Sequence, residues 1–477
     1  MSVLRWPTRN LLLSALLLCT AAVGAGTEPY DRQGWYGEGS ATSDDVQRVP
    51  VPPGHGAPDS VLVLEGGRVF DGTGAPARPA TVVVEGKTIT AILAPGESDW
   101  PASAQRIDAS GLTVLPGLID LHTHLSYVRQ FGLPAPLSAE SVADGTLRGL
   151  ERMQQYLQSG ITSVRDLASH GEVPFVLKRW QASGRIAGPR VFPAGQLITG
   201  RGGHGTEGFG LRTFPAHAQA PVWEASGPDE WRDAVRAQFK RGADVIKLGS
   251  HYSQAEITAA VAEAHALGLP VTVDAETHYI DMAIAAGVDV IEHPLPRSDA
   301  ALRAMAREDI AAVPTLVPYQ YIIRQSGGYY GSTSRRFTLT EDSILEMTRA
   351  MKRAGIRIGV GTDLIVDWAD YLPTAYIDEL ENLMRAGFTE AGALQAATRV
   401  SADILGMGDR LGTLEVGKLA DILLVAGEPD RHLRDLARVH TVIVNGRLLV
   451  VDGRLHGEPL RALPPPPPSP RRPGNHF

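Results

Sequence analysis

Short apolar segments alternate with amphipathic segments through the middle of the chain, and this alternation restricts the possible folds more than any other feature. The apolar segments are typical of buried strands: one ends near His122, and the others are ITSVRDLA, RVFPAGQLI, DVIKLGS, LPVTVDAE, VDVIEHP, IAAVPTLVP and IRIGVGTD. Between them lie helical patterns such as DEWRDAVRAQFKRG and SQAEITAAVAEAHALG. Strand–helix repetition predicts parallel βα units, and eight candidate strands predict an α/β fold of the (β/α)8 TIM-barrel type.

Both ends of the chain flank this region with short β-rich segments separated by glycine-containing turns, such as SVLVLEGGRVFDG and VHTVIVNGRLLVVDGRL. They predict a small β-sandwich built from residues 59–115 and 406–460, beside a barrel of residues 116–405. Residues 26–58 lack periodicity and predict a linker, and the proline-rich residues 461–477 predict an extended tail.

The first 25 residues have the pattern of a secretory signal peptide. Basic Arg5 and Arg9 precede an apolar stretch, and small residues follow it. We therefore expect residues 1–25 to be removed and the protein to be exported, periplasmic or secreted, with an uncleaved anchor as the alternative. The single cysteine, Cys19, lies in this segment, so a metal in the mature protein must be held by imidazole, carboxylate or lysine-derived oxygen.

Composition restricts the partners. The chain is 43% hydrophobic, its mean hydropathy is −0.06, and its formal net charge is −8, with no basic block in the body of the chain. These values indicate a soluble globular protein and argue against a nucleic-acid or anionic-membrane partner. We expect a small-molecule substrate and no membrane association after signal cleavage, and homo-oligomerisation stays open.

Polar side chains stand out at the ends of the apolar strands, beginning with His122 and His124 in LPGLIDLHTHLSY. Residues two apart in a strand point to the same face, so these two imidazoles lie together, with Asp120 on the same face. A single strand histidine is usually a packing or surface residue. Two on one face, next to a Pro–Gly turn, indicate a metal-binding pair.

Four further strand ends carry Lys247, Asp274, His293 and Asp363. Each alone could cap a helix or pair with an opposite charge. Because chemistry in such barrels lies at the C-terminal ends of the strands, we expect all six side chains to converge on one rim. Carboxylates and imidazoles without cysteine favour zinc or a similar divalent ion.

With these motifs in place, the sequence resembles the metal-dependent amidohydrolase superfamily from about residue 60 to residue 455. The resemblance rests on PGLIDLHTHL, GITSVRDLA, GGHG, ADVIKLG, AGVDVIEH, GVGTD and the ending LGTLEVGKLADILLV. The GGHG and IKLG motifs are similar to those of the branch that contains imidazolonepropionase-like and Xaa-Pro dipeptidase-like enzymes.

The resemblance implies two divalent metal ions and a role for most of the candidates. His122 and His124 resemble the pair that binds the more buried ion, and His293 resembles a ligand of the second ion. Lys247 resembles a lysine that is carboxylated to bridge the ions, which makes chemical sense because an ammonium group has only donors. Asp363 resembles the catalytic aspartate that binds the first ion and shuttles a proton from the attacking water.

The implied reaction is hydrolysis of an amide carbon–nitrogen bond, in a dipeptide or a cyclic amide, by metal-activated water. The same site could instead hydrolyse a lactone, an ester or an organophosphate. The alternative from a different class is a catalytically degraded barrel that serves as a periplasmic binding or scaffold protein.

One position departs from the family pattern, because Asp274 stands where relatives carry a histidine. Asp274 could itself bind the second metal; the added negative charge would make the bound water less acidic and the reaction slower at neutral pH. His278 could swing back as a substitute ligand, or the second metal could be absent.

Other residues near the expected rim have smaller expected roles. The candidates for substrate binding are His204 in the GGHG loop, Tyr127 and His251. We expect Arg165 in the VRDL segment to form a structural Arg–Asp pair.

Overall fold

The computed structural model describes residues 60–127, 142–206, 220–331, 336–365 and 371–456. The segments expected to form the signal peptide, the linker and the proline-rich tail lie outside these ranges. None of the helices in the described ranges combines the length and the apolar character that a membrane crossing requires.

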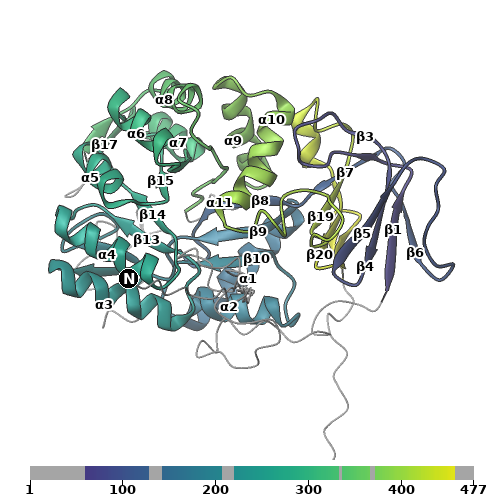
Figure 1. Ribbon diagram of the computed structural model, residues 1–477, viewed down its shortest axis with the longest axis horizontal. Helices are drawn as coiled ribbons and strands as arrows, with labels where there is room; N and C mark the ends of the chain where they lie inside the picture. Colours follow the sequence, from purple (N-terminus) through teal and green to yellow (C-terminus); the bar gives the residue numbers. More distant parts are fainter. Residues whose placement is uncertain (1–59, 128–141, 207–219, 332–335, 366–370, 457–477) are drawn as a thin grey trace, which may run out of the picture.

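The middle of the chain forms parallel strands joined by helices, as the alternation predicts (Figure 1). One parallel sheet contains β8 (Leu118–Thr123), β9 (Ile161–Asp166) and β10 (Arg190–Pro193). A second has the order β12-β11-β13-β14-β15-β16. Its strands are β11 (Leu197–Gly200), β12 (Val222–Ala225), β13 (Ile246–Gly249), β14 (Val271–Asp274), β15 (Val290–Glu292) and β16 (Ala311–Val313).

Backbone hydrogen bonds outside these strands link the edges of the two parallel sheets. On one side, Gly359 N donates to Ala312 O of β16 at 3.0 Å, and Leu121 N of β8 donates to Val360 O at 2.8 Å. On the other side, β10 and β11 follow one another along the chain and are separated at Gly195, whose φ is 77°. Seven of the eight expected barrel segments therefore form strands, in two linked parallel sheets and not in one continuously paired sheet, while the eighth, IRIGVGTD, pairs with β16 at an isolated bridge between Ile358 and Ala312.

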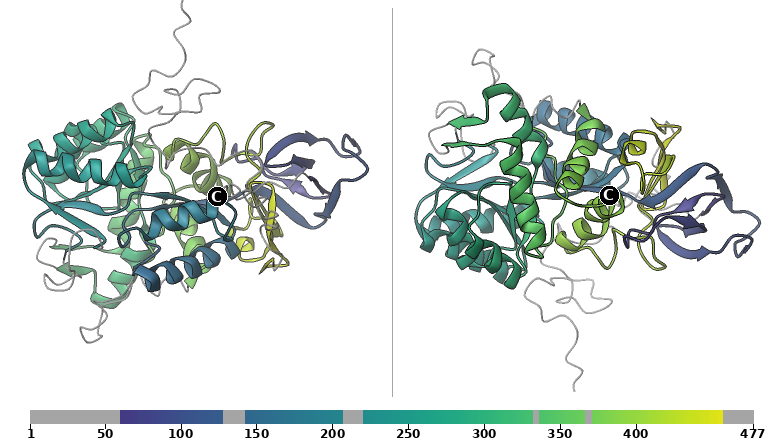
Figure 2. Two further views of the ribbon diagram at one scale, coloured as in Figure 1. Left: turned by 90° about the horizontal axis from the view of Figure 1, so that it is seen from below. Right: turned by 90° about the horizontal axis from the view of Figure 1, so that it is seen from above.

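Helices lie outside the parallel strands in both views of Figure 2. They are α1 (Val142–Gln158), α2 (Val173–Ala182), α3 (Gly227–Arg241), α4 (Gln254–Ala266), α5 (His278–Ala286), α6 (Asp299–Arg307), α7 (Leu316–Ser326), α8 (Glu341–Arg353), α9 (Thr374–Arg385), α10 (Glu390–Gln395) and α11 (Ser401–Ile404). A π-helical segment, Ala396–Val400, joins the last two, and a hairpin of β17 (Tyr329–Gly331) and β18 (Arg336–Thr338) follows α7.

Local sequence fixes several helix ends. Ser253 and Thr340 form capping boxes at the starts of α4 and α8, and their hydroxyls accept hydrogen bonds from otherwise unpaired backbone N–H groups. Gly242 and Gly287 end α3 and α5 in the left-handed conformation that glycine adopts most easily. The helices pack on the strands through a large hydrophobic cluster that includes the fully buried Trp231.

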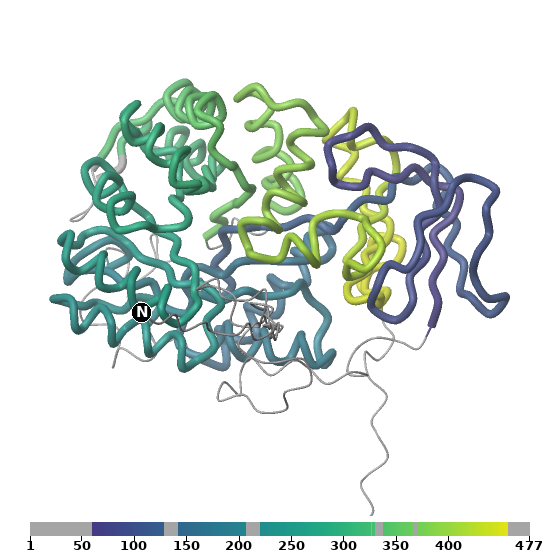
Figure 3. The backbone as a smooth tube through the Cα atoms, viewed as in Figure 1, coloured from purple at the N-terminus to yellow at the C-terminus, as the bar shows by residue number. Residues whose placement is uncertain are grey.

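Strands from both ends of the chain form a smaller β-domain beside the parallel strands (Figures 1 and 3). One sheet has the order β5-β4-β1-β6 and the other β22-β21-β20-β19-β7-β2-β3. The strands are β1 (Val61–Glu65), β2 (Arg68–Val69), β3 (Arg78–Pro79), β4 (Thr81–Glu85), β5 (Thr88–Leu93), β6 (Gln105–Asp108), β7 (Leu112–Pro116), β19 (Ile422–Ala426), β20 (Val439–Val444), β21 (Arg447–Val451) and β22 (Arg454–Leu455).

The pairing within this domain joins segments that are far apart in the sequence. β7 pairs antiparallel with β19, with Leu115 opposite Leu423. Side chains of both sheets, among them Leu64 and Val84 from one and Val114 and Ile422 from the other, share one hydrophobic cluster. We retain the β-sandwich as an interpretation of this packing.

Candidate metal centre

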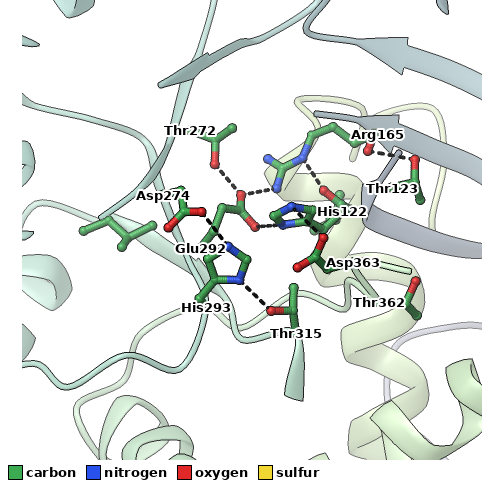
Figure 4. A network of polar contacts seen from close by, with 12 residues as sticks. His122, Thr123, Arg165, Thr272, Asp274, Glu292, His293, Thr315, Thr362 and Asp363 are labelled. Carbon is green, nitrogen blue, oxygen red and sulfur yellow. Dashed lines mark hydrogen bonds and ion pairs between the residues drawn. The ribbon is translucent and has the colours of Figure 1, made fainter. Parts of the chain in front are cut away.

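Most candidate ligands lie in or directly after the parallel strands, Asp363 follows the segment that bridges β16 at Ile358, and Figure 4 shows several of them directed toward one another. His122 belongs to β8, Lys247 to β13 and Asp274 to β14, while His293 directly follows β15. These four side chains are buried, and Asp363 is only 17% exposed at its side chain. The fold therefore gathers them in one interior site.

His122, His124 and Asp363 form the tightest group of potential ligands. One ligand atom from each lies within 4.8 Å of the others. His124 Nε2 is 3.0 Å and His122 Nε2 is 3.6 Å from Asp363 Oδ1. Burial would raise the pKa of Asp363, but the two imidazoles outweigh it and hold that pKa well below its usual range. An ionised carboxylate thus faces two imidazoles, a donor set that fits zinc.

Hydrogen bonds at Nδ1 leave Nε2 of both imidazoles directed at Asp363. His124 Nδ1 lies 3.1 Å from Ala168 O, and because a carbonyl oxygen only accepts, Nδ1 carries the proton. His122 Nδ1 lies 2.8 Å from Glu292 Oε2. Burial, aided by the charge of Lys247, lowers the pKa of His122 to about 3, so this imidazole is neutral, as metal ligation requires.

Glu292 is a site residue that the sequence analysis did not identify. Its Oε1 accepts hydrogen bonds from Arg165 Nη2 at 2.6 Å and from Thr272 Oγ1 (Figure 4). Burial would raise the pKa of Glu292, but the charge of Arg165 and the hydrogen bond from His122 outweigh it and hold that pKa well below its usual range. The signal that could have revealed it is a carboxylate inside the apolar segment VDVIEHP, next to a candidate ligand.

The prediction of a structural Arg–Asp pair was therefore wrong, because the partner of Arg165 is Glu292. Adjacent residues of β9 point to opposite faces, so Arg165 reaches Glu292 while Asp166 faces away from it. The Asp166 carboxylate accepts from Leu125 N at 3.1 Å and from Ser169 Oγ at 2.8 Å.

Asp274 and His293 form a second group beside the first. His293 Nε2 is 2.9 Å from Asp274 Oδ2, and His293 Nδ1 is 2.8 Å from Thr315 Oγ1. His293 and Thr315 have φ values of 66° and 47°, which residues other than glycine seldom adopt. Arg297 Nη2 donates to His293 O at 3.0 Å and helps to hold this conformation. Such strain is typical of functional sites.

Lys247 is 1% exposed, and within the described part of the chain its Nζ has no hydrogen-bond partner. Burial lowers its pKa even though Glu292, Asp274 and Asp363 lie nearby. A buried amine without hydrogen bonds is costly, so Lys247 Nζ lacks a binding partner that its position requires. The set of donor atoms and the buried Lys247 amine both fit a metal centre.

The remaining candidates lie at different distances from this centre. His204 Nε2 is 2.7 Å from Asp274 Oδ2, and the Tyr127 ring stacks on His124 with centroids 4.3 Å apart. His251 is half-buried and stacks on Tyr279 at 5.2 Å.

The structure does not bring His278, the alternative ligand, to the centre. It is exposed at the start of α5, with its ring 4.2 Å from that of Tyr279. Its polar contact is with Thr277 Oγ1, 3.3 Å from Nδ1.

Comparison with known proteins assigns the family. The model of the Amidohydrolase family matches residues 113–449, more than half of the chain. An ochratoxinase from Aspergillus niger is 27% identical over 429 residues, which cover 82% of this chain and 86% of that protein. An imidazolonepropionase from Symbiobacterium thermophilum is 27% identical over 383 residues, which cover 73% and 84% of the two chains.

A solved structure extends the likeness to three dimensions. That of an Xaa-Pro dipeptidase with bound methionine has a TM-score of 0.72 and 28% identity, and the match covers 82% of this chain and 99% of that one. Neighbours of this kind imply a TIM-barrel fold for the parallel strands, and the branch predicted from the GGHG and IKLG motifs is confirmed. The chain is a hydrolase and belongs to the amidohydrolase family.

Proposed function

We propose that this chain hydrolyses amide carbon–nitrogen bonds in a small-molecule substrate and that it depends on divalent metal. The observation that carries the proposal is the convergence of His122, His124 and Asp363 beside the buried Lys247 amine. The likeness to an Xaa-Pro dipeptidase supports a dipeptide or a related amide as the substrate class. Export through a signal peptide in residues 1–25 is part of the proposal and rests on the N-terminal pattern alone.

The residues divide into two ligand sets. We propose that His122, His124 and Asp363 hold one ion, with zinc favoured by the donor set, and that Lys247, Asp274 and His293 hold a second. Bound metal supplies Lewis acidity and lowers the pKa of water to near neutrality. Lys247 would contribute as a carbamate, in which its neutral amine forms a bond to the carbon of CO2 and releases a proton.

The protein side chains then have defined tasks. Asp363 accepts a proton from the attacking water and returns it to the leaving nitrogen, which completes cleavage of the amide bond. Glu292 fixes His122 with its proton on Nδ1, and Arg165 keeps Glu292 ionised. Ala168 O orients His124 in the same way.

The first test is metal dependence. Purified protein reconstituted with zinc is expected to hold two equivalents and to hydrolyse members of a panel of dipeptides, N-acyl amino acids and cyclic amides. Chelation should abolish this activity and zinc should restore it. A protein that stays metal-free after reconstitution would contradict the proposal and favour a binding or scaffold role. Activity confined to lactones, esters or organophosphates would overturn the amide assignment.

Lys247→Ala tests the second ligand set. We expect the variant to lose the second metal equivalent and to lower kcat/KM about 100-fold, because a residue that would hold the second ion is missing. Short carboxylic acids that fit the vacated space should restore part of the rate. Lys178→Ala is the matched control, because Lys178 pairs with Asp244 at 2.6 Å. Two tightly bound equivalents in Lys247→Ala would refute the bridging role.

A further inference from the structure

The buried carboxylate of Asp274 lies against two imidazoles through a single oxygen. Asp274 is 1% exposed, and its Oδ2 is 2.9 Å from His293 Nε2 and 2.7 Å from His204 Nε2. His293 directly follows β15, the strand next to that of Asp274, whereas His204 comes from the loop after β11. A buried carboxylate requires such partners, because an unpaired charge in the interior is costly.

The loop that carries His204 is built to hold it in this place. His204 N donates to Ser250 O at 2.5 Å, and Thr199 Oγ1 donates to the same carbonyl at 2.9 Å. A Cβ on Gly203 would lie 2.3 Å from Thr199 Oγ1 and 2.8 Å from His251 N, so only glycine fits there. The loop is thus anchored to the segment that follows β13, the strand of Lys247.

The contact geometry distinguishes between possible roles of His204. In the described ranges, the group of three ligand atoms mutually within 4.8 Å consists of His122, His124 and Asp363. His204, Asp274 and His293 do not form such a group, so His204 is not placed as a third ligand beside them. Its Nε2 is instead engaged with Asp274 Oδ2 at 2.7 Å, which directs its action at that carboxylate.

We propose that His204 is a positioning residue for Asp274. Its Nε2–H donates to Oδ2 and fixes the carboxylate that would serve the second metal, so that an Asp–His pair, from the end of β14 and the loop after β11, takes the place of a single side chain. This inference rests on the proposed function. It also reassigns His204, which the sequence analysis placed among the substrate-binding candidates.

The test measures metal binding without substrate. The full-length protein, freed of metal, is titrated with Co²⁺ alone; the number of equivalents, their affinities by chelator competition and the visible spectrum are recorded. His204→Ala should weaken the second equivalent by about 10–100-fold and leave the first unchanged. His204→Gln, whose amide can still donate, should bind it more tightly than His204→Ala. His278→Ala, which removes an exposed histidine, should match the wild type.

A second comparison tests whether His204 acts through the Asp274 carboxylate. If His204 acts only through the carboxylate, then His204→Ala should have no effect on cobalt affinity when Asp274→His is already present. Circular dichroism of each variant checks that the fold is retained.

Several results would overturn the inference. Unchanged cobalt affinity in His204→Ala, with only a raised KM, would make His204 a substrate-binding residue. Equal losses in His204→Ala and His204→Gln would exclude the hydrogen-bond role. If the wild type bound at most one equivalent of Co²⁺, the inference about His204 would also be overturned. The proposed hydrolysis would then remain possible at a site with a single metal ion. Conversely, two equivalents of which only the second depends on His204, in a protein inactive on amides, would overturn only the proposed function.

Discussion

Asp363→Asn is expected to lower kcat/KM for amide hydrolysis by about 10³-fold, the largest effect on activity that the site predicts. The carboxylate lies 3.0 Å from His124 Nε2 and is held ionised by both imidazoles. An amide of the same shape cannot accept the proton of the attacking water. Steady-state kinetics on the wild type and the variant, with metal content measured on the same samples, separate lost proton transfer from lost metal.

Asp233→Asn is the control for this substitution, because its side chain is 72% exposed on α3 and its nearest basic partner, Arg236, is 3.9 Å away. It should retain the full rate. A rate within about tenfold of the wild type in metal-loaded Asp363→Asn would remove Asp363 from proton transfer.

Glu292→Gln is expected to destabilise the metal-free protein by about 3–5 kcal/mol. The substitution keeps the shape but removes the carboxylate charge that lies 2.6 Å from the buried Arg165 guanidinium, and it alters the partner of His122 Nδ1. An uncompensated buried charge accounts for the expected loss. Urea denaturation of the metal-free protein measures the free energy of unfolding without a contribution from bound metal.

Glu263→Gln provides the comparison, since Glu263 pairs with Arg236 at 2.7 Å where the arginine side chain is 59% exposed. That surface pair should contribute little to the free energy of unfolding, because water and salt screen its charges. If Glu292→Gln cost no more than Glu263→Gln, the buried pair would not be a stability determinant.

Much of the fold and of the metal centre could be predicted from sequence because both follow regular rules. Alternation of apolar strands and helices predicts the parallel sheets, and the positions of Lys247 and Asp363 at strand ends place them on one rim. The spacing of His122 and His124 places both imidazoles on one face. These inferences need no knowledge of side-chain contacts.

Glu292 was missed because the backbone departs from strand geometry at the next residue. Alternation assigns Glu292 and His293 to opposite faces, yet both contact the centre. His293 has a φ of 66°, which turns its side chain back toward the site, and no pattern in the sequence encodes that turn. Loop residues such as His204 present the same difficulty, because a loop has no periodicity from which a direction can be read.

The antiparallel pairing of β7 with β19 has a consequence for biosynthesis. β7 leaves the ribosome early, whereas Ile422–Ala426, which must pair beside it, is made only after the entire set of parallel strands. Until then one edge of β7 is open, and open edges can pair with other chains. The small domain can therefore close only after β19 has been translated. A prematurely stopped chain would leave this edge of β7 exposed to quality control.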